Sequence, residues 1–362
     1  MNHLKNSYAV LERLRLPHGL YLAAAGEDYH YVWLRDSFYE VLPYLNSPCT
    51  RYEDTYHSIL DMFRDLEWKL DIHQLSRPDS QWEYIHAKYN AKTLKEIDEP
   101  WGHAQHDAVG AILFGIAEGE RVGKQILRDF KDKEIVQKII GYLECCRYWE
   151  DPDNGMWEEW REVHTSSLGA VVAGLQAIDE QKIVEVPSWL IAKGRNALLN
   201  LLPMESATRS VDLAQLSLIY PYDVLSYPVA SEIVERVEKQ LLRERGVCRY
   251  NGDSYYSTVE SDGRDKALSH YFGTEAEWTF GLPWLAICNF QLGNEEKALD
   301  YLQRTENVML PDGSLPELYF SGKNEWNGNT PLGWSNALYI LAMNIVKGQS
   351  MNCKNKKEEE SR

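Results

Sequence analysis

The segment His103–Gly119, which reads HAQHDAVGAILFGIAEG, indicates what kind of fold surrounds it. Small and apolar residues such as Ala108, Ala111 and Gly115 recur along one face, which is the pattern of a helix packed closely on its neighbours. A glycine at position 119 is typical of the end of a helix. The segment therefore predicts a helix that lies among other helices.

The same periodicity, followed outward, predicts eleven further helices. They are expected at 4–16, 34–45, 52–75, 132–148, 165–178, 187–201, 211–218, 229–242, 274–291, 294–306 and 333–347. Twelve helices in consecutive pairs predict six helical hairpins that close into a double ring, with loops at one end of the inner ring around a pocket. The prolines and irregular aromatics of 76–100 predict a long functional loop. The strand signals at 247–250 and 255–259, around an Asn-Gly pair, predict a small hairpin.

The composition is that of a globular protein. Of the 362 residues, 44% are hydrophobic, which is enough for one large core or two ordinary ones. The formal net charge of -17, with no cluster of Lys and Arg, argues against a nucleic-acid-binding surface and favours a neutral partner. The 12 Trp and 22 Tyr suit stacking on the apolar faces of sugars, although most aromatic side chains in any protein belong to the core.

No membrane contact is expected, because no apolar run approaches the length of a membrane helix and the N-terminus has no apolar leader region. We expect a cytoplasmic protein with no linker between domains. The prediction is one domain over 1–349 and a charged, disordered tail over 350–362. The six cysteines fall at no spacing typical of zinc sites or redox pairs, so free thiols are expected. The oligomeric state is not indicated.

Two adjacent carboxylates between tryptophans stand in MWEEWR at 156–161, just after the turn-forming run DPDNG. A glutamate such as Glu158 beside indole surface loses hydration, which favours its neutral form and suits a general acid. In the alternative interpretation, Trp157 and Trp160 are ordinary core anchors, and Glu158 and Glu159 form a solvated loop edge.

Arg35 and Asp36 end the run YVWLRD at the start of a predicted helix. They are either an ion pair at the helix N-terminus or a donor and an acceptor that grip two neighbouring hydroxyl groups. In WGHAQHD, Trp101 is a candidate stacking platform. His103 and His106 lack a carboxylate at zinc-ligand spacing, so we expect helix capping or core hydrogen bonds and no metal.

Arg249 lies in the tyrosine-rich run CRYNGDSYY, which is suited to the rim of a sugar site. Glu317 follows Pro316 in extended chain, ahead of the last predicted helix. If the ring closes, Glu317 can face Glu158 across the pocket. Carboxyl groups ~6.5 to 9.5 Å apart leave room for a water molecule, which leads to inversion at the anomeric carbon.

These motifs together resemble those of the glucoamylase-like glycoside hydrolase family, family 15, which also contains the N-terminal domains of the phosphorylase kinase α and β subunits. The resemblance covers most of the chain, from about Tyr21 to Ala342. Its pieces are YVWLRD (31–36), IHAKYN (85–90), WGHAQHD (101–107), WEE (157–159), EWTF (277–280) and PELY (316–319). The chain departs from the family at Ala104, where proline is frequent, and at Pro316, where serine commonly precedes the base.

The resemblance implies an all-α fold, an (α/α)6 barrel, and an inverting, exo-acting α-glucosidase that needs no cofactor and no metal. It implies that Glu158 is the general acid and Glu317 the general base, that Arg35 and Asp36 clamp the terminal sugar, and that Trp101, Glu159 and Arg249 complete the substrate site. Glu277 is assigned to the same site as a residue that supports the pocket rather than acts on the bond. Without the β-sandwich and starch-binding modules of many relatives, the expected substrate is a short α-linked gluco-oligosaccharide or disaccharide. A trehalase and a non-hydrolytic, sugar-sensing module remain the alternatives.

Overall fold

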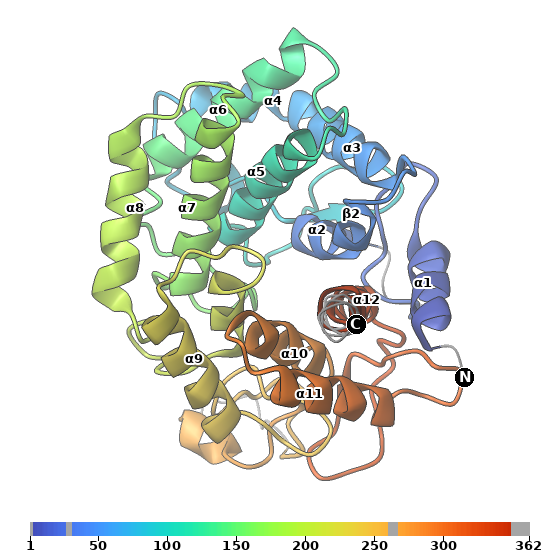
Figure 1. The fold of residues 1–362 in the computed structure, drawn as a ribbon. Coiled ribbons are helices and arrows are strands. Elements are labelled where there is room, and N and C mark those ends of the chain that lie inside the picture. The colour runs from blue at the N-terminus through green and yellow to red at the C-terminus, as the bar shows by residue number, and fades with distance from the viewer. Residues whose placement is uncertain (1–2, 27–30, 260–266, 349–362) are drawn as a thin grey trace, which may run out of the picture.

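The computed structural model describes residues 3–26, 31–259 and 267–348, and these ranges are mostly helical (Figure 1). The predicted tail at 350–362 lies outside the described residues. The α-helices are α1 (His3–Leu14), α2 (Leu34–Val41), α3 (Arg51–Asp65), α4 (Glu67–Ile72), α5 (His106–Arg121), α6 (Phe130–Cys146), α7 (Thr165–Glu180), α8 (Ser188–Leu201), α9 (Tyr227–Gln240), α10 (Gly281–Gln291), α11 (Glu295–Asn307) and α12 (Gly333–Ala342). The remaining elements are η1 (Leu42–Tyr44), η2 (Gln81–Glu83), η3 (Leu213–Leu218), η4 (Leu268–Tyr271), the π-helix η5 (Met343–Lys347), and the strands β1 (Tyr31–Trp33), β2 (Lys88–Asn90), β3 (Glu277–Trp278) and β4 (Leu318–Tyr319).

Helices α2, α5, α7, η3, α10 and α12 form a closed inner ring, in which each contacts the next and α12 returns to α2 (Figure 1). The outer layer consists of α1 against α12, α3 against α2 and α5, α6 against α3 and α5, α8 against α7, α9 against η3 and α10, and α11 against α10 and α12. This arrangement is an all-α (α/α)6 barrel, and it confirms the predicted double ring of paired helices.

Several predicted boundaries differ from the structure. The single run expected at 52–75 is divided at Leu66, whose backbone (φ -94°, ψ 9°) ends α3 before α4 begins. The segment expected at 211–218 forms the short 3-10 helix η3, capped by the side chain of Asp212. The run expected at 274–291 begins with strand β3, which pairs with β4, and becomes helical only in α10.

The predicted hairpin of 247–250 with 255–259 is wrong. The backbone N–H and C=O of Val247 exchange hydrogen bonds of 3.0 Å with Trp278 of β3 instead. Tyr255 and Tyr256 form a turn, and Thr258 lies in a bend. The Asn-Gly turn signal lies in a real turn, in which Gly252 has φ +84°, but the partner strand comes from about thirty residues further along the chain.

Two short antiparallel strands attach the long loop to the ring. Strand β1, directly before α2, pairs with β2 in the register Tyr31 to Asn90, Val32 to Tyr89 and Trp33 to Lys88. This pairing brings part of the predicted loop 76–100 next to the N-terminus of an inner helix, where the candidate site residues lie.

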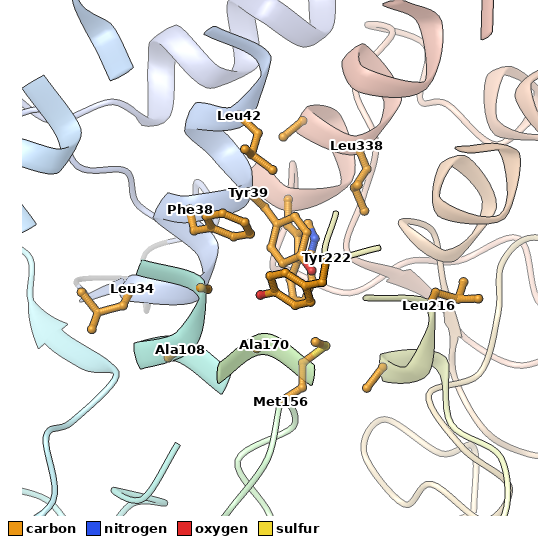
Figure 2. Packing of buried hydrophobic residues seen from close by; sticks show 14 of the residues in the cluster. Leu34, Phe38, Tyr39, Leu42, Ala108, Met156, Ala170, Leu216, Tyr222 and Leu338 are labelled. Atoms are coloured by element: carbon orange, nitrogen blue, oxygen red, sulfur yellow. The ribbon is translucent and has the colours of Figure 1, made fainter. Parts of the chain in front are cut away.

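Residues from different inner helices fill the middle of the ring. Figure 2 shows Phe38 and Tyr39 of α2, Ala108 of α5, Ala170 of α7 and Leu338 of α12 gathered there. All five side chains are fully buried. The barrel therefore has a packed interior rather than a channel along its axis.

Glycines allow α5 and α7 to cross closely, as the small-residue pattern of α5 predicts. A Cβ added to Gly110 would lie 2.5 Å from the carbonyl carbon of Ala170 and from the backbone nitrogen of Val171. A Cβ added to Gly174 would lie 2.6 Å from the carbonyl oxygen of Gly110. Backbone atoms cannot move aside as a flexible side chain can.

We expect Gly110→Ala to lower the free energy of unfolding by about 1 to 3 kcal/mol, because overpacking at this crossing outweighs the gain in helix propensity. Urea denaturation measures the change. Gly348→Ala is the matched control, since Gly348 has ordinary helical φ (-64°) and no heavy atom of the described residues lies within 4 Å of its added Cβ. Its expected effect is zero or a gain of about 0.4 to 1 kcal/mol. Equal losses for both variants would contradict the close crossing.

Candidate active site

Seven of the eight predicted site residues line one pocket with a volume of about 510 Å³. They are Arg35, Asp36, Trp101, Glu158, Glu159, Arg249 and Glu317. They come from the starts of inner helices and from the loops that precede them, as expected for the open end of such a ring.

The eighth residue, Glu277, does not contact the pocket. Its carboxylate accepts hydrogen bonds from the backbone N–H groups of Arg245 (2.6 Å) and Gly322 (3.1 Å). The sequence leads us to expect that Glu277 supports the pocket rather than acts on the bond, and these two contacts are consistent with that role. Its charge is directed away from the pocket because two orphan backbone donors of neighbouring loops bind it, so Glu277 supports the wall of the pocket from behind.

The base of the pocket consists of stacked aromatic rings. Phe280 and Trp334 stack with ring centroids 4.8 Å apart and an angle of 3° between their planes. Trp157 stacks on Phe280 at 6.1 Å, and Tyr39 packs beneath Trp334 at 4.6 Å. Trp157, Phe280 and Trp334 line the pocket, so its inner end is closed by large flat surfaces.

Glu158 lies on a tightly folded loop between α6 and α7. The loop is closed by backbone pairing of Asp153 with Glu162, and Glu158 itself has φ +61°, in the left-handed region that a glutamate rarely adopts. Such strain persists only where the surroundings hold it, and it is frequent at functional sites. Close contact with the Trp101 loop contributes here, because a Cβ on Gly102 would lie 2.8 Å from the side chain of Asn154.

Two donors hold the carboxylate of Glu158. Arg35 Nη2 lies 3.2 Å from Oε1, and the indole Nε1–H of Trp101 donates to Oε2 at 2.6 Å. Trp101 therefore contacts Glu158 through the N–H edge of its ring. The other terminal nitrogen of Arg35 donates to Asp107 (2.9 Å) and Gln105 (3.1 Å). Arg35 is thus fixed by protein groups on both terminal nitrogens.

Asp36 lies beside these groups at the first turn of α2 and is buried. Burial raises the pKa of Asp36 to about 7; the Arg35 guanidinium opposes this increase, while the charges of Glu158 and Glu317 add to it. The pKa of Asp36 thus depends on the charges of both glutamates that the sequence assigns to catalysis. The three carboxyl groups belong to one electrostatic unit.

Glu159 anchors the opposite part of the site. Its Oε1 accepts from Arg249 (2.8 Å), and its Oε2 accepts from Tyr250 (2.6 Å) and from Arg209. Burial acts to raise the pKa of Glu159, but the two guanidinium groups and the tyrosine hydroxyl outweigh it and lower that pKa. Asp253 binds Arg249 through two contacts of 2.6 Å. Glu159 and Arg249 therefore form a rigid, charged wall.

Glu317 is placed by two asparagines. Its Oε2 accepts hydrogen bonds from the amides of Asn329 (2.8 Å) and Asn327. Glu158 precedes α7 and Glu317 precedes α12, and these helices are three places apart in the six-membered inner ring. The two glutamates are thus supplied from opposite sides of the barrel to one pocket, as the sequence predicted.

Comparison with known proteins identifies the family and relates the fold to solved structures. Residues 5–266 match the family model described as glycosyl hydrolases family 15. The chain belongs to this family. Rabbit (Oryctolagus cuniculus) phosphorylase b kinase regulatory subunit alpha, skeletal muscle isoform, is 26% identical over 313 residues, which cover 73% of this chain and 25% of the relative. The chain thus spans about a quarter of the length of that curated relative.

Solved structures of glycosidases share the fold of this family-15 chain. A glycosidase variant in complex with glucose has a TM-score of 0.79 and 20% identity, covering 95% of this chain and 96% of the other. The glucoamylase of Saccharomycopsis fibuligera has a TM-score of 0.71 and 15% identity, covering 96% and 95%. At these identities the likeness establishes the (α/α)6 fold.

The sequence analysis did not identify three groups that belong to the family-15 site: Asn329 and Lys88, which line the pocket, and Arg209, which contacts a lining residue. Arg209 holds Glu159, and Asn329 holds Glu317. Lys88 of β2 lines the pocket beside Trp101, within the IHAKYN motif that supported the family resemblance. A signal for Lys88 was therefore present, but no role was assigned to it.

The predicted histidine pair makes core contacts. His103 Nε2 lies 3.0 Å from the carbonyl oxygen of Glu99, and His106 Nε2 lies 2.9 Å from Asp151. Over the described ranges, no cluster of three or more His, Cys, Asp or Glu side chains is arranged to hold a metal ion. A search of the same residues finds no helix with the length and apolar character needed to span a membrane.

A buried charged histidine supports the Glu158 loop from below. A Cβ on Gly155 would lie 2.8 Å from the ring of His164, so the loop packs directly on this residue. Burial disfavours the charged ring, but Glu205, whose Oε1 lies 3.6 Å from Nδ1, and the charge of Asp153 outweigh burial and raise the pKa of His164 to about 9. At neutral pH, His164 is an imidazolium between two carboxylates.

This charge makes stability depend on pH. Because the folded-state pKa of His164 lies above its unfolded value of about 6.5, the stabilisation is complete below about pH 6.5 and is lost as pH rises through about 9. It is on the order of 3 kcal/mol at 1.36 kcal/mol per pKa unit. We expect His164→Gln to lower the melting temperature at pH 6 and to differ much less from the wild type at pH 10. A difference that stays constant between these pH values would contradict the assignment.

Proposed function

We propose that this family-15 chain is an inverting, exo-acting glycoside hydrolase that releases β-glucose from the non-reducing end of short α-glucosides. Glu158 is the general acid and Glu317 the general base. The observation that carries the proposal is the presence of both carboxyl groups in one pocket, supplied from opposite sides of the inner ring. Inverting hydrolysis requires two carboxyl groups on opposite faces of one sugar.

The remaining groups of the pocket suit a terminal sugar. Part of its wall is formed by the buried, stacked rings of Trp157, Phe280 and Trp334. Flat aromatic surfaces suit the apolar C–H faces of a sugar ring. Asp36 and Arg249, which also line the pocket, supply an acceptor and a donor for its hydroxyl groups. We infer that a pocket with such a wall binds a terminal sugar residue.

The reaction proceeds in one displacement. Glu158 starts protonated and transfers its proton to the glycosidic oxygen as the bond from that oxygen to the anomeric carbon breaks. Glu317 takes a proton from a water molecule whose oxygen attacks the opposite face of the same carbon. The products are β-glucose and the shortened alcohol, with Glu158 ionised and Glu317 protonated. Exchange with solvent restores both groups.

Incubation of the protein with maltose, isomaltose, longer oligosaccharides and trehalose tests the proposal. Proton NMR follows glucose and its anomeric form before mutarotation. We expect β-glucose to appear first from at least one α-glucoside. If α-glucose appears first, the inverting mechanism is wrong. If trehalose is the one substrate cleaved, the chain is a trehalase of the same family.

The second candidate function is a sugar-sensing module without turnover. The observation that favours it is the similarity to a kinase regulatory subunit, a quarter of which this chain covers. Calorimetry with the same sugars separates the two functions. Binding of an oligosaccharide without release of glucose from any member of the panel would support the sensor and exclude the hydrolase.

A further inference from the structure

Lys88 lies in the pocket wall within a cage of aromatic rings. Its side chain belongs to β2, and the residue is 4% exposed. The ammonium nitrogen lies 3.7 Å from the ring centroid of Trp101, 4.0 Å from that of Tyr31 and 5.1 Å from that of Trp33. Lysine is rarely buried without a charged partner, and at this site aromatic faces stabilise the cation.

No carboxylate of the described ranges forms an ion pair with Lys88. Burial lowers the pKa of Lys88, while the charges of Glu158 and Glu99 oppose that decrease. The ammonium group is therefore partly desolvated and attracted to Glu158 without touching it. Direct contact of the lysine is with indole and phenol rings.

The indole ring of Trp101 requires a further contact to hold it in place. It lies on the loop between β2 and α5, and 38% of the residue is exposed, so the barrel core alone does not hold its ring. The edge of the same ring donates the 2.6 Å hydrogen bond to Glu158. Lys88 on the face of the indole and Glu158 at its N–H edge thus fix Trp101 from two directions.

We propose that Lys88 is a positioning residue that acts through Trp101: it holds the indole ring so that its N–H remains on the carboxyl group of Glu158. The inference rests on the proposed function in its assignment of Glu158 as the acid. A positive charge over the ring face also increases the polarity of the indole N–H. Loss of Lys88 should therefore weaken the hydrogen bond from Trp101 to Glu158 and change the pH at which this carboxyl group is protonated.

A double-mutant cycle tests the route of action. We expect Lys88→Met to lower kcat about tenfold with a smaller change in KM, because a displaced catalytic group affects the chemical step most. Lys88→Arg should restore most of the activity, since a guanidinium also binds an indole face. In a Trp101→Phe background, Lys88→Met should cause little further loss. An equal loss in both backgrounds would overturn the proposal, because Lys88 would then act without Trp101.

Lys193→Met is the matched control. Lys193 also lies over indole rings, 4.4 Å from Trp149 and 5.6 Å from Trp189, but these residues do not line the pocket. The Lys193→Met substitution removes a similar cation–aromatic contact and should leave kcat and KM unchanged. A tenfold loss in Lys193→Met would show that such contacts affect turnover through general stability, which would contradict a specific role for Lys88.

A second readout does not depend on turnover. In protein labelled with 15N-tryptophan, the Trp101 indole signal is assigned by its loss in Trp101→Phe, and its pH titration reports the proton on Glu158. Charged and titratable groups around that carboxyl group include Arg35, Asp36, Lys88 and Tyr255. In Lys88→Met we expect the midpoint to move to higher pH, because a positive charge is removed. An unchanged midpoint would overturn the inference, whereas absence of hydrolysis with a moved midpoint would reject the proposed function alone.

Discussion

Glu158→Gln is expected to lower kcat on an α-glucoside by about 10² to 10⁴-fold, the range typical of a lost general acid. Glutamine preserves the size of the side chain, and its amide oxygen can still accept a hydrogen bond from Arg35 or Trp101. It has no acidic proton to give to the leaving oxygen. Steady-state kinetics measure the loss, and an unchanged melting temperature shows that the variant is folded.

The leaving group distinguishes an acid from any other role. Fluoride departs with little help from a proton, so Glu158→Gln should retain far more activity on α-glucosyl fluoride than on maltose. Glu162→Gln is the control in the same loop, because the carboxylate of Glu162 binds Ser206 and Thr208 outside the pocket. Its activity should stay within about twofold of the wild type. Retained maltose hydrolysis in Glu158→Gln would remove Glu158 from its role.

Glu317→Gln is expected to lower kcat by a similar factor, about 10² to 10⁴-fold, on both kinds of substrate. Water must be activated whatever the leaving group, so a reactive fluoride does not rescue a missing base. The amide oxygen of the variant can keep the hydrogen bonds from Asn327 and Asn329, and the fold should be unaffected.

Comparison of the Glu158→Gln and Glu317→Gln variants tests which glutamate is the acid and which is the base. Glu325→Gln, an exposed position in the loop after β4, is the control and should be fully active. If Glu317→Gln spared fluoride hydrolysis while Glu158→Gln abolished it, the two roles would have to be exchanged. If both variants lost only binding, with kcat unchanged at saturating sugar, neither glutamate would be catalytic.

Helix periodicity was sufficient for the architecture because the inner helices are rich in small and apolar residues, as in α5, and most of their residues are buried among other helices. It was insufficient where the chain changes direction without a glycine or proline, as at Leu66 between α3 and α4. It also failed at the predicted hairpin, since a turn signal at Gly252 contains no information on which distant segment pairs with Val247.

The candidate site was predictable where a motif combines unusual residue types, as Glu158 and Glu159 do between tryptophans. Arg209 and Asn329 were not predictable, because an isolated arginine or asparagine in a loop acquires meaning only from the glutamate it reaches in the folded chain. Glu277 shows the converse. Its aromatic setting resembles that of Glu158, yet backbone donors of neighbouring loops take its charge.

Closure of the inner ring by α12 against α2 has a consequence for how the chain acquires its pocket during synthesis. Asp36 and α2 emerge from the ribosome roughly three hundred residues before Glu317 and α12, at about 5 to 20 residues per second. The apolar faces of the early helices therefore stay uncovered until α12 packs against α2 and closes the barrel. Contacts between such distant parts of a chain form slowly, and the nascent protein depends on protection from aggregation during that interval.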